Sequence, residues 1–187
     1  QTQDLEAYNL YIQGRKMWNT RTREGMRDSI GKFELALAKD PQFALAHVGI
    51  ADAYNFLVGY GYSPPKISTP KAKEELNKAF ALNENLSEAH ASMGWIHFNY
   101  DWNWDAAKKS FDKALAINPS NPEARRWLSH LYMILGQVTE AMNEIEKGIN
   151  IEPDSANMLT TKSHYLLSIG QLDQSLETAM EAERKDP

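Results

Sequence analysis

The chain contains no cysteine, so disulfide bonds, thiolate nucleophiles and cysteine-based zinc sites are all excluded. A chain without cysteine fits a reducing compartment, and we expect a cytoplasmic protein. Long apolar runs are missing as well, because none approaches the roughly 18 residues that a membrane span requires. We also expect no signal peptide and no association with a membrane.

Clustered positive charge is equally scarce. The net charge is −5, and the 20 lysine and arginine residues form only small groups, such as Arg21 and Arg23 or the pair Arg125 and Arg126. Because binding to phosphate groups needs a basic face, the sequence argues against nucleic acid as a direct partner.

No motif in the sequence points to catalysis. An HExxH zinc motif, a glycine-rich phosphate loop, a Gly-x-Ser-x-Gly elbow and a paired-carboxylate arrangement are all missing. We therefore expect no enzyme activity, no cofactor and no metal.

What the sequence does contain is an internal repeat. Residues 107–124 read AKKSFDKALAINPSNPEA and residues 141–158 read AMNEIEKGINIEPDSANM. An offset of 34 positions aligns Ala107 with Ala141, Phe111 with Ile145, Ile117 with Ile151 and Pro119 with Pro153. A fixed period of this length in helix-forming sequence predicts stacked helical hairpins.

The same register extends along the chain in both directions. It divides the chain into five units, residues 7–43, 44–86, 87–121, 122–155 and 156–187. The closing positions of these units are Pro41, Glu84, Pro119, Pro153 and Pro187. Proline cannot continue a helical hydrogen-bond ladder, so we expect each second helix to end before it.

Small side chains recur where paired helices must come within about 8–10 Å of each other. On the first helices they are Gly14, Ala51, Gly94, Ser129 and Ser163. On the second helices they form two columns, Ser29, Ala72, Ala107, Ala141 and Ser175, then Ala36, Ala79, Ala114, Gly148 and Ala182. Bulky side chains fill the seam between these columns, at Phe33, Leu76, Phe111 and Ile145.

These columns and closing prolines resemble tetratricopeptide repeats (TPRs) over nearly the whole chain. The resemblance implies an all-α fold, a right-handed superhelical solenoid of five TPR hairpins. Four stretches, AYNLYIQGRKMWNTRTREGMRDSIGKFELALAKDP, ALAHVGIADAYNFLVGYG, SEAHASMGWIHFNYDWNW and ALAINPSNPEARRW, also resemble the C-terminal repeat region of multidomain bacterial signalling proteins. In that family the region follows a winged-helix, class III adenylate cyclase or serine/threonine kinase domain. Because the chain opens with Gln1 rather than methionine, we expect a fragment of a longer protein.

Two irregular segments lie in the first two units. The polar loop Asn19–Gly25 carries basic charges that we expect to be solvated. Between Val58 and Pro70 the segment GYGYSPPKISTP is rich in turn formers, so we expect it to be non-helical. It is either a functional loop or, more simply, a surface flap packed by its tyrosines, Tyr60 and Tyr62.

The third and fifth units are also irregular. In the turn NYDWNWDAA of the third unit, Trp102 and Trp104 either plug the end of the hairpin or form an exposed docking anchor, and the plug is our preferred interpretation. Gly136 and Gly170 predict left-handed caps on the first helices of the last two units. The final unit is atypical, with Leu172, Leu176 and Met180 poorly covered.

The first helices of such a solenoid line its concave side. In proteins that this chain resembles, positions 2, 5, 9, 12 and 13 of each unit face that groove. The partner-binding candidates are therefore Tyr8, Tyr11, Arg15, Trp18, Asp52, Asn55, Trp95, Asn99, Arg126, His130 and His164, with Phe98 and Met133 beside them. Aromatic residues and arginine are frequent binding anchors. The alternative is that half of these side chains pack between neighbouring hairpins instead of facing a partner.

Two specific partners can be tested on the sequence. The carboxylate clamp of chaperone-binding repeats needs lysine, asparagine and arginine, but its positions here hold Tyr11, Arg15, Gly49, Glu88 and Ser92. We therefore expect no binding of chaperone tails. His130 and His164 occupy the same position in successive units and are expected to lie near each other, but two imidazoles alone do not make a metal site.

The sequence thus predicts a non-catalytic protein–protein interaction module that binds a peptide or helix, including one from another domain of its parent protein. Its role would be regulatory or sensory in a bacterial signalling protein or transcription regulator. Two alternatives remain open: an oligomerisation module that forms a homodimer through its terminal repeat, and a small-ligand-sensing domain.

Overall fold

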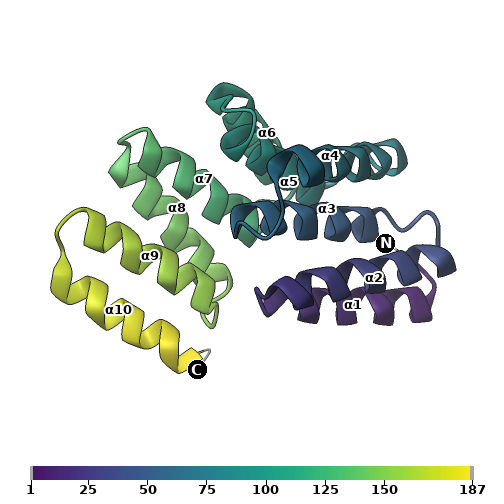
Figure 1. The fold of residues 1–187 in the computed structure, drawn as a ribbon. Helices are drawn as coiled ribbons and strands as arrows, with labels where there is room; N and C mark the ends of the chain where they lie inside the picture. The colour runs from purple at the N-terminus through teal and green to yellow at the C-terminus, as the bar shows by residue number, and fades with distance from the viewer. Residues whose placement is uncertain (1, 186–187) are drawn as a thin grey trace.

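The computed structural model describes residues 2–185, which form ten α-helices and no strand (Figure 1). The helices are α1 (Leu5–Asn19), α2 (Arg23–Lys39), α3 (Ala44–Gly59), α4 (Pro65–Leu82), α5 (Ser87–Asn99), α6 (Trp104–Ile117), α7 (Pro122–Ile134), α8 (Val138–Ile151), α9 (Ala156–Ser168) and α10 (Leu172–Lys185). They pair in chain order as five antiparallel hairpins, and the predicted fold class is confirmed. The last predicted closing position, Pro187, lies outside the described residues.

The helix ends follow local chemistry. The side chains of Asp4, Thr22, Asn103 and Asn121 accept a hydrogen bond from the first turn of α1, α2, α6 and α7, respectively. Gly136 and Gly170 have φ angles of +73° and +81° after α7 and α9, so the predicted left-handed caps are confirmed. The helices α2, α6 and α8 end two residues before Pro41, Pro119 and Pro153, as predicted.

Paired helices approach closely because bulky rings face small residues. Phe33, Leu76, Phe111 and Ile145 are fully buried, as are the alanines of the two small-residue columns up to the fourth hairpin. A Cβ atom placed on Gly14 would lie 2.5 Å from Cε1 of Phe33, and one on Gly94 would lie 2.6 Å from Cε1 of Phe111. The predicted seam and columns are therefore the core of this fold.

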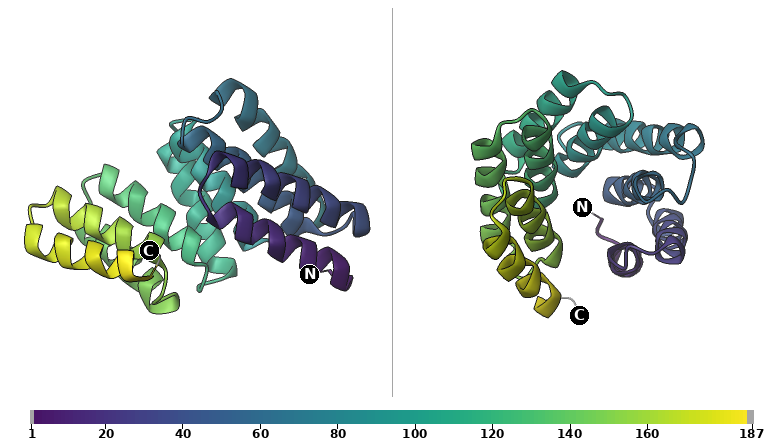
Figure 2. Two further views of the ribbon diagram at one scale, coloured as in Figure 1. Left: turned by 60° about the horizontal axis from the view of Figure 1, so that its bottom comes forward. Right: turned by 60° about the vertical axis from the view of Figure 1, so that its left-hand side comes forward.

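The row of hairpins is curved. Successive first helices (α1, α3, α5, α7 and α9) pack on one another, whereas each second helix packs only on the helices before and after it in the described chain. The side occupied by the first helices is therefore the concave side. The curvature brings the first hairpin opposite the last two across the interior of the molecule (Figure 2).

Two predicted boundaries are wrong. The loop expected at Asn19–Gly25 is shorter, because Thr22 accepts a hydrogen bond from the backbone N–H of Gly25 at 3.0 Å and starts α2 at Arg23. The segment expected to be non-helical up to Pro70 becomes helical at Pro65, where proline suits the first position of a helix. The rest of that segment forms a stacked flap, in which Tyr60 lies 5.9 Å from both Phe56 and Tyr62 between ring centroids.

Candidate functional site

The predicted partner-binding residues all lie on first helices and so belong to the concave side. Tyr8, Tyr11, Arg15 and Trp18 lie on α1, Asp52 and Asn55 on α3, Trp95 and Asn99 on α5, Arg126 and His130 on α7, and His164 on α9. Most of them line the hollows described below, but Tyr8 and Arg126 do not. Trp18, Asp52 and Asn55 are buried, so part of the set packs between hairpins.

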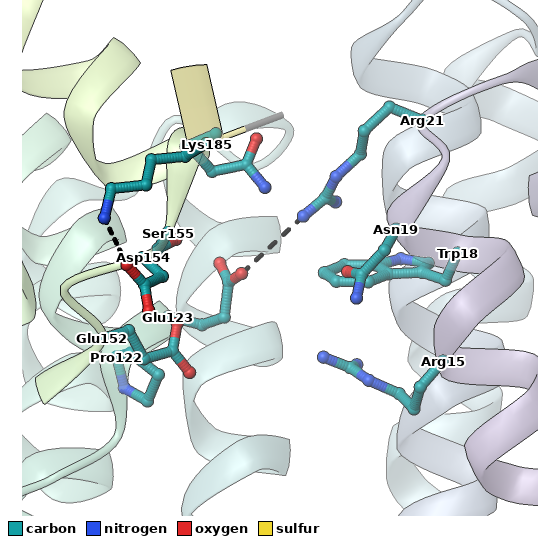
Figure 3. Close-up of a pocket in the computed structure, with 12 residues that line it drawn as sticks. Arg15, Trp18, Asn19, Arg21, Pro122, Glu123, Glu152, Asp154, Ser155 and Lys185 are labelled. Atoms are coloured by element: carbon teal, nitrogen blue, oxygen red, sulfur yellow. Dashed lines mark hydrogen bonds and ion pairs between the residues drawn. The ribbon is translucent and has the colours of Figure 1, made fainter. Parts of the chain in front are cut away.

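The first hollow lies between α1 and the loop that precedes α9, and its volume is about 340 Å³ (Figure 3). One wall is an arginine–tryptophan cluster made of Arg15, Trp18 and Arg21. The guanidinium groups of Arg15 and Arg21 lie 4.2 and 3.7 Å from the ring centroid of Trp18. The facing wall is acidic and includes Glu123, Glu152 and Asp154.

Arg21 joins the two walls. Its Nη2 atom lies 3.8 Å from Oε1 of Glu123, whose other carboxylate oxygen accepts a 2.6 Å hydrogen bond from Arg126. Burial lowers the pKa of Arg21 to about 10, against the opposing effect of Glu123. Burial would raise the pKa of Glu123, but the charges of Arg126 and Arg21 outweigh it and hold that pKa below its ordinary value. The prediction that the basic side chains of this loop are solvated is wrong for Arg21, whose guanidinium also stacks on Phe56.

The second hollow, of about 190 Å³, brings together four of the five positions of the chaperone-tail clamp, all but Gly49. Tyr11, Arg15, Ser92 and Glu88 line it, together with Asp52 and Glu123. Arg15 is already paired with Asp52 at 3.3 Å, and Ser92 donates to the same carboxylate. Burial raises the pKa of Asp52 to about 6, which is still below neutral pH. The acidic side chains of Asp52, Glu88 and Glu123 therefore disfavour a further carboxylate in this space.

The third hollow, which we call the aromatic pocket, has a volume of about 510 Å³. It is lined by Trp95, Phe98, Asn99, Trp102, Trp104, His130, Met133, Ile134, His164, Tyr165 and Ser168. These side chains come from the C-terminal halves of α5, α7 and α9, from the turn before α6 and from Trp104, the first residue of α6. His130 and His164 thus share one pocket, as the repeat register predicted.

The two tryptophans of that turn do not plug the hairpin. Trp102 is 74% exposed and Trp104 is 37% exposed at the edge of the aromatic pocket. The preferred interpretation of the sequence was therefore wrong. The turn is held by its backbone, since Asn103 donates its N–H to the carbonyl of His97 and caps α6 with its side chain, so no indole is needed to close the end.

A smaller hollow of about 200 Å³ adjoins the aromatic pocket and shares Trp95 and Asn99 with it. Asn55 lines this space, and its Nδ2 atom is buried without a hydrogen-bond partner in residues 2–185. A buried donor left unpaired costs about 1–3 kcal/mol. A carbonyl oxygen from outside the described chain would remove that cost.

Several residues of these hollows were not among the sequence-based candidates. Arg21 and Glu123 meet only because the chain curves, and the repeat register carries no signal for that. Tyr165 follows His164 and was missed because the groove positions select only one of the two. Among the described residues, no group of three or more histidine, aspartate or glutamate side chains is arranged to hold a metal ion, and no helix is long and apolar enough to cross a membrane.

These features define a class of protein, a helical-hairpin solenoid with an aromatic concave side. Residues 103–165 match the family described as tetratricopeptide repeat. The hairpins before the matched segment have the same architecture, so the fold of the whole described chain is that of TPR proteins.

Solved structures share this fold. A thermophilic TPR protein of Thermus thermophilus superposes with a TM-score of 0.73 at 17% identity, covering 97% of this chain and 92% of that one. PilW, a widely conserved type IV pilus biogenesis factor, superposes with a TM-score of 0.66 at 18% identity, covering 97% of this chain and 78% of that one.

Two curated relatives are distant in sequence. Hsp70-Hsp90 organizing protein 3 of Arabidopsis thaliana is 24% identical over 117 residues, which cover 63% of this chain and 21% of that protein. The transcriptional regulator HilA of Salmonella typhimurium is 20% identical over 158 residues, which cover 84% of this chain and 28% of that protein. The chain spans less than a third of the length of either relative.

Proposed function

We propose that this TPR domain is a non-catalytic module that binds an extended peptide or a helix of a protein partner on its concave side. The observation that carries the proposal is the unpaired, buried amide of Asn55 beside the aromatic pocket. A peptide supplies both a backbone carbonyl for the amide and a side chain for the pocket. This pairing of a polar anchor with an apolar cavity is typical of peptide recognition.

The partner is further proposed to belong to a regulatory circuit, as a bacterial cytoplasmic protein or as another domain of the same parent protein. Two similarities support this proposal. The amino-acid sequence of the repeats resembles that of bacterial signalling proteins. The relative HilA is a transcriptional regulator, and the matched region is only a part of it. The domain would then report a binding event to an attached output domain.

Chaperone tails are not the proposed partner, although one relative is named an Hsp70-Hsp90 organizing protein. The hollow at the clamp positions contains Glu88, Asp52 and Glu123. Its one arginine, Arg15, is already paired with Asp52. A C-terminal carboxylate would meet net repulsion there.

The proposal is tested with a random-peptide display library on the immobilised domain, followed by affinity measurements on enriched peptides. We expect Asn55→Leu, which removes the amide donor at similar size, to weaken those peptides about fivefold or more. Asn77→Leu is the matched control, because Asn77 is exposed on α4, outside the concave side. A library without enriched peptides, or peptides indifferent to Asn55→Leu, would contradict the proposal.

A second candidate function rests on a separate observation. Leu172, Leu176 and Met180 lie at four-residue spacing on α10 and are more than half exposed, as the sequence predicted. One repeat earlier, Met142 occupies the position of Leu176 and packs against the cluster that contains Met158 and Tyr165 of α9. The exposed stripe on α10 is therefore suited to pairing with the same stripe of a second copy.

Sedimentation velocity at two protein concentrations tests this candidate. We expect a dimer that is lost in Leu176→Glu, while Leu35→Glu, at an exposed leucine on α2, keeps it. A monomer at high concentration removes oligomerisation and leaves the peptide-binding proposal intact.

A further inference from the structure

The aromatic pocket contains one hydrogen-bond acceptor whose orientation follows from its neighbours. The hydroxyl of Ser129 donates to the carbonyl of Arg126 at 2.7 Å, so it accepts at its 2.9 Å contact with the hydroxyl of Tyr165. Tyr165 therefore donates to Ser129 and accepts from Nδ1–H of His130, also at 2.9 Å. This chain of hydrogen bonds places the proton of His130 on Nδ1 and leaves a lone pair on Nε2.

The Nε2 atom of His130 is available to a ligand. No residue between 2 and 185 hydrogen-bonds it, it is not among the fully buried polar atoms, and His130 lines the pocket. Burial and the charge of Arg126 lower the pKa of His130 to about 3, which keeps the ring neutral at physiological pH. The pocket thus offers an acceptor rather than a cation.

The remainder of the lining selects an uncharged, aromatic group. It contains no aspartate, glutamate, lysine or arginine, and it includes the aromatic and apolar side chains of Trp95, Phe98, Trp104, Met133 and Tyr165. Its volume of about 510 Å³ lies within the usual range of about 300–1,000 Å³ for ligand pockets. An anion would find no positive charge there, and a polar aliphatic group would leave the rings unfilled.

Trp102 holds the left-handed cap position after α5 that Gly136 and Gly170 hold after α7 and α9, with a φ angle of +53°. A tryptophan therefore stands where glycine is preferred, yet its indole is 74% exposed and contributes little to the core. Strained residues of this kind gather at binding sites. At the edge of the aromatic pocket, the indole is placed to cover a bound group.

We propose that the aromatic pocket binds the tryptophan side chain of a peptide partner, with the indole N–H donating to Nε2 of His130 and Trp102 covering the ring. This inference rests on the proposed peptide-binding function and names the side chain that is recognised. Indole fits better than phenol, because it is a donor only and leaves no lone pair facing the apolar walls. The adjoining Asn55 amide holds the peptide backbone, which favours a peptide over a free aromatic compound.

The test titrates the isotope-labelled domain with acetyl-Gly-Gly-Trp-Gly-Gly-amide and follows the binding by NMR. The 15N shifts of the His130 ring report its tautomer directly. We expect a peptide with 1-methyltryptophan, which lacks the N–H donor, to bind roughly three- to tenfold more weakly. Peptides with phenylalanine, tyrosine or trimethyl-lysine at the same position, and N-acetyltryptophanamide alone, should also bind more weakly.

Two variants locate the binding. Trp102→Gly should weaken the tryptophan peptide about fivefold or more while leaving the thermal midpoint equal or higher, because glycine accepts the φ of +53°. Ile134→Glu places a charge in the pocket wall and should also weaken binding. Leu135→Glu is its matched control, since Leu135 is the next exposed apolar residue and does not line the pocket.

Each outcome decides a specific point. Any one of four results would overturn the inference. They are equal affinity for the tryptophan and 1-methyltryptophan peptides, tighter binding of the trimethyl-lysine peptide, equal binding of N-acetyltryptophanamide, and full affinity in Trp102→Gly. Library-selected peptides that bind without a tryptophan preference would overturn it too, but would leave the peptide-binding function standing. Absence of any peptide binding, in the library as well, would remove both.

Discussion

At the scale of single residues, glycine decides how closely the first hairpins approach. The ring of Phe33 is fully buried between Gly14 of α1 and Gly49 of α3. A Cβ atom would lie 2.5 Å from that ring at Gly14 and 2.7 Å from it at Gly49. Such distances cannot be accommodated without moving the ring or the helices, so the two glycines are required by packing.

Gly14→Ala is therefore expected to destabilise the domain by about 1–3 kcal/mol through overpacking, measured by urea unfolding. Gly31→Ala in α2 is the matched control, because nothing lies within 4 Å of its added Cβ. That control should stabilise the helix by about 0.5–1 kcal/mol. Similar effects of both substitutions would contradict this account of the seam.

A second residue-scale prediction concerns Asp52. Burial raises its pKa from 3.8 to about 6, so its ionised form is less stable in the folded chain than in the unfolded chain. The folded state therefore binds the proton more tightly, and the contribution of Asp52 to stability declines as the pH rises through this range. By linkage, the whole decline is on the order of 3 kcal/mol.

Asp52→Asn removes this titration. We expect the stability of the variant, relative to the original chain, to rise as the pH increases from about 4 to above 6 and then to level off. Urea unfolding of both proteins across that range measures the difference. A difference that does not change with pH would show that Arg15 and Ser92 fully offset the effect of burial.

At the scale of elements, α4 begins earlier than its sequence suggested and contains a proline. Pro65 is the first residue of α4, but Pro70 lies inside the helix, where it cannot donate a hydrogen bond to the carbonyl of Lys66. Both prolines are exposed. The sequence suggested that the chain is non-helical at both prolines. What distinguishes their effect on α4 is only their position, at its first residue or in its interior.

Pro70→Ala is expected to stabilise the domain by about 1–2 kcal/mol, as the restored hydrogen bond exceeds the added freedom of the unfolded chain. Pro65→Ala should have little effect or be mildly destabilising, because proline is preferred at the first helical position. Thermal unfolding followed by circular dichroism compares the two variants. Stabilisation by Pro65→Ala alone would reverse our assignment of the start of α4.

At the scale of the whole molecule, curvature brings the first hairpin against the fourth. Arg21, stacked on Trp18 and Phe56, reaches across to Glu123 at the start of α7. Arg21 lies in the turn between α1 and α2, and neither of these helices has backbone packing with α7. The ion pair therefore acts as a clasp on the row of hairpins (Figure 3).

Glu123→Gln should release the clasp. We expect a larger radius of gyration in small-angle X-ray scattering and a stability loss of about 1–2 kcal/mol, since the pair is only partly buried. High salt should expand the original chain in the same direction, by a smaller amount. Glu140→Gln, at an exposed position on α8, is the control, and an unchanged radius in Glu123→Gln would exclude the clasp.

The sequence by itself determined the hairpins, because a repeat needs only its neighbours. The signals for a hairpin act over one or two helical turns and can be found by aligning the chain with itself. They are the spacing of bulky residues such as Phe111 and Ile145 from small ones such as Ala107 and Ala141, and the proline or glycine that follows a helix. The resemblance to TPR proteins implied which positions of a unit face the concave side, and the register carried those positions to each unit.

Only the tertiary structure decided which of these side chains remain available to a partner. The sequence made Trp18 a partner-binding candidate and favoured a plug for Trp102, yet Trp18 is sealed between two arginines and Trp102 is 74% exposed. The difference arises from curvature, which accumulates over several hairpins and brings together residues far apart in the chain, such as Arg21 and Glu123. Local periodicity cannot encode that distance, because small rotations between successive hairpins add up before the two ends of the row meet.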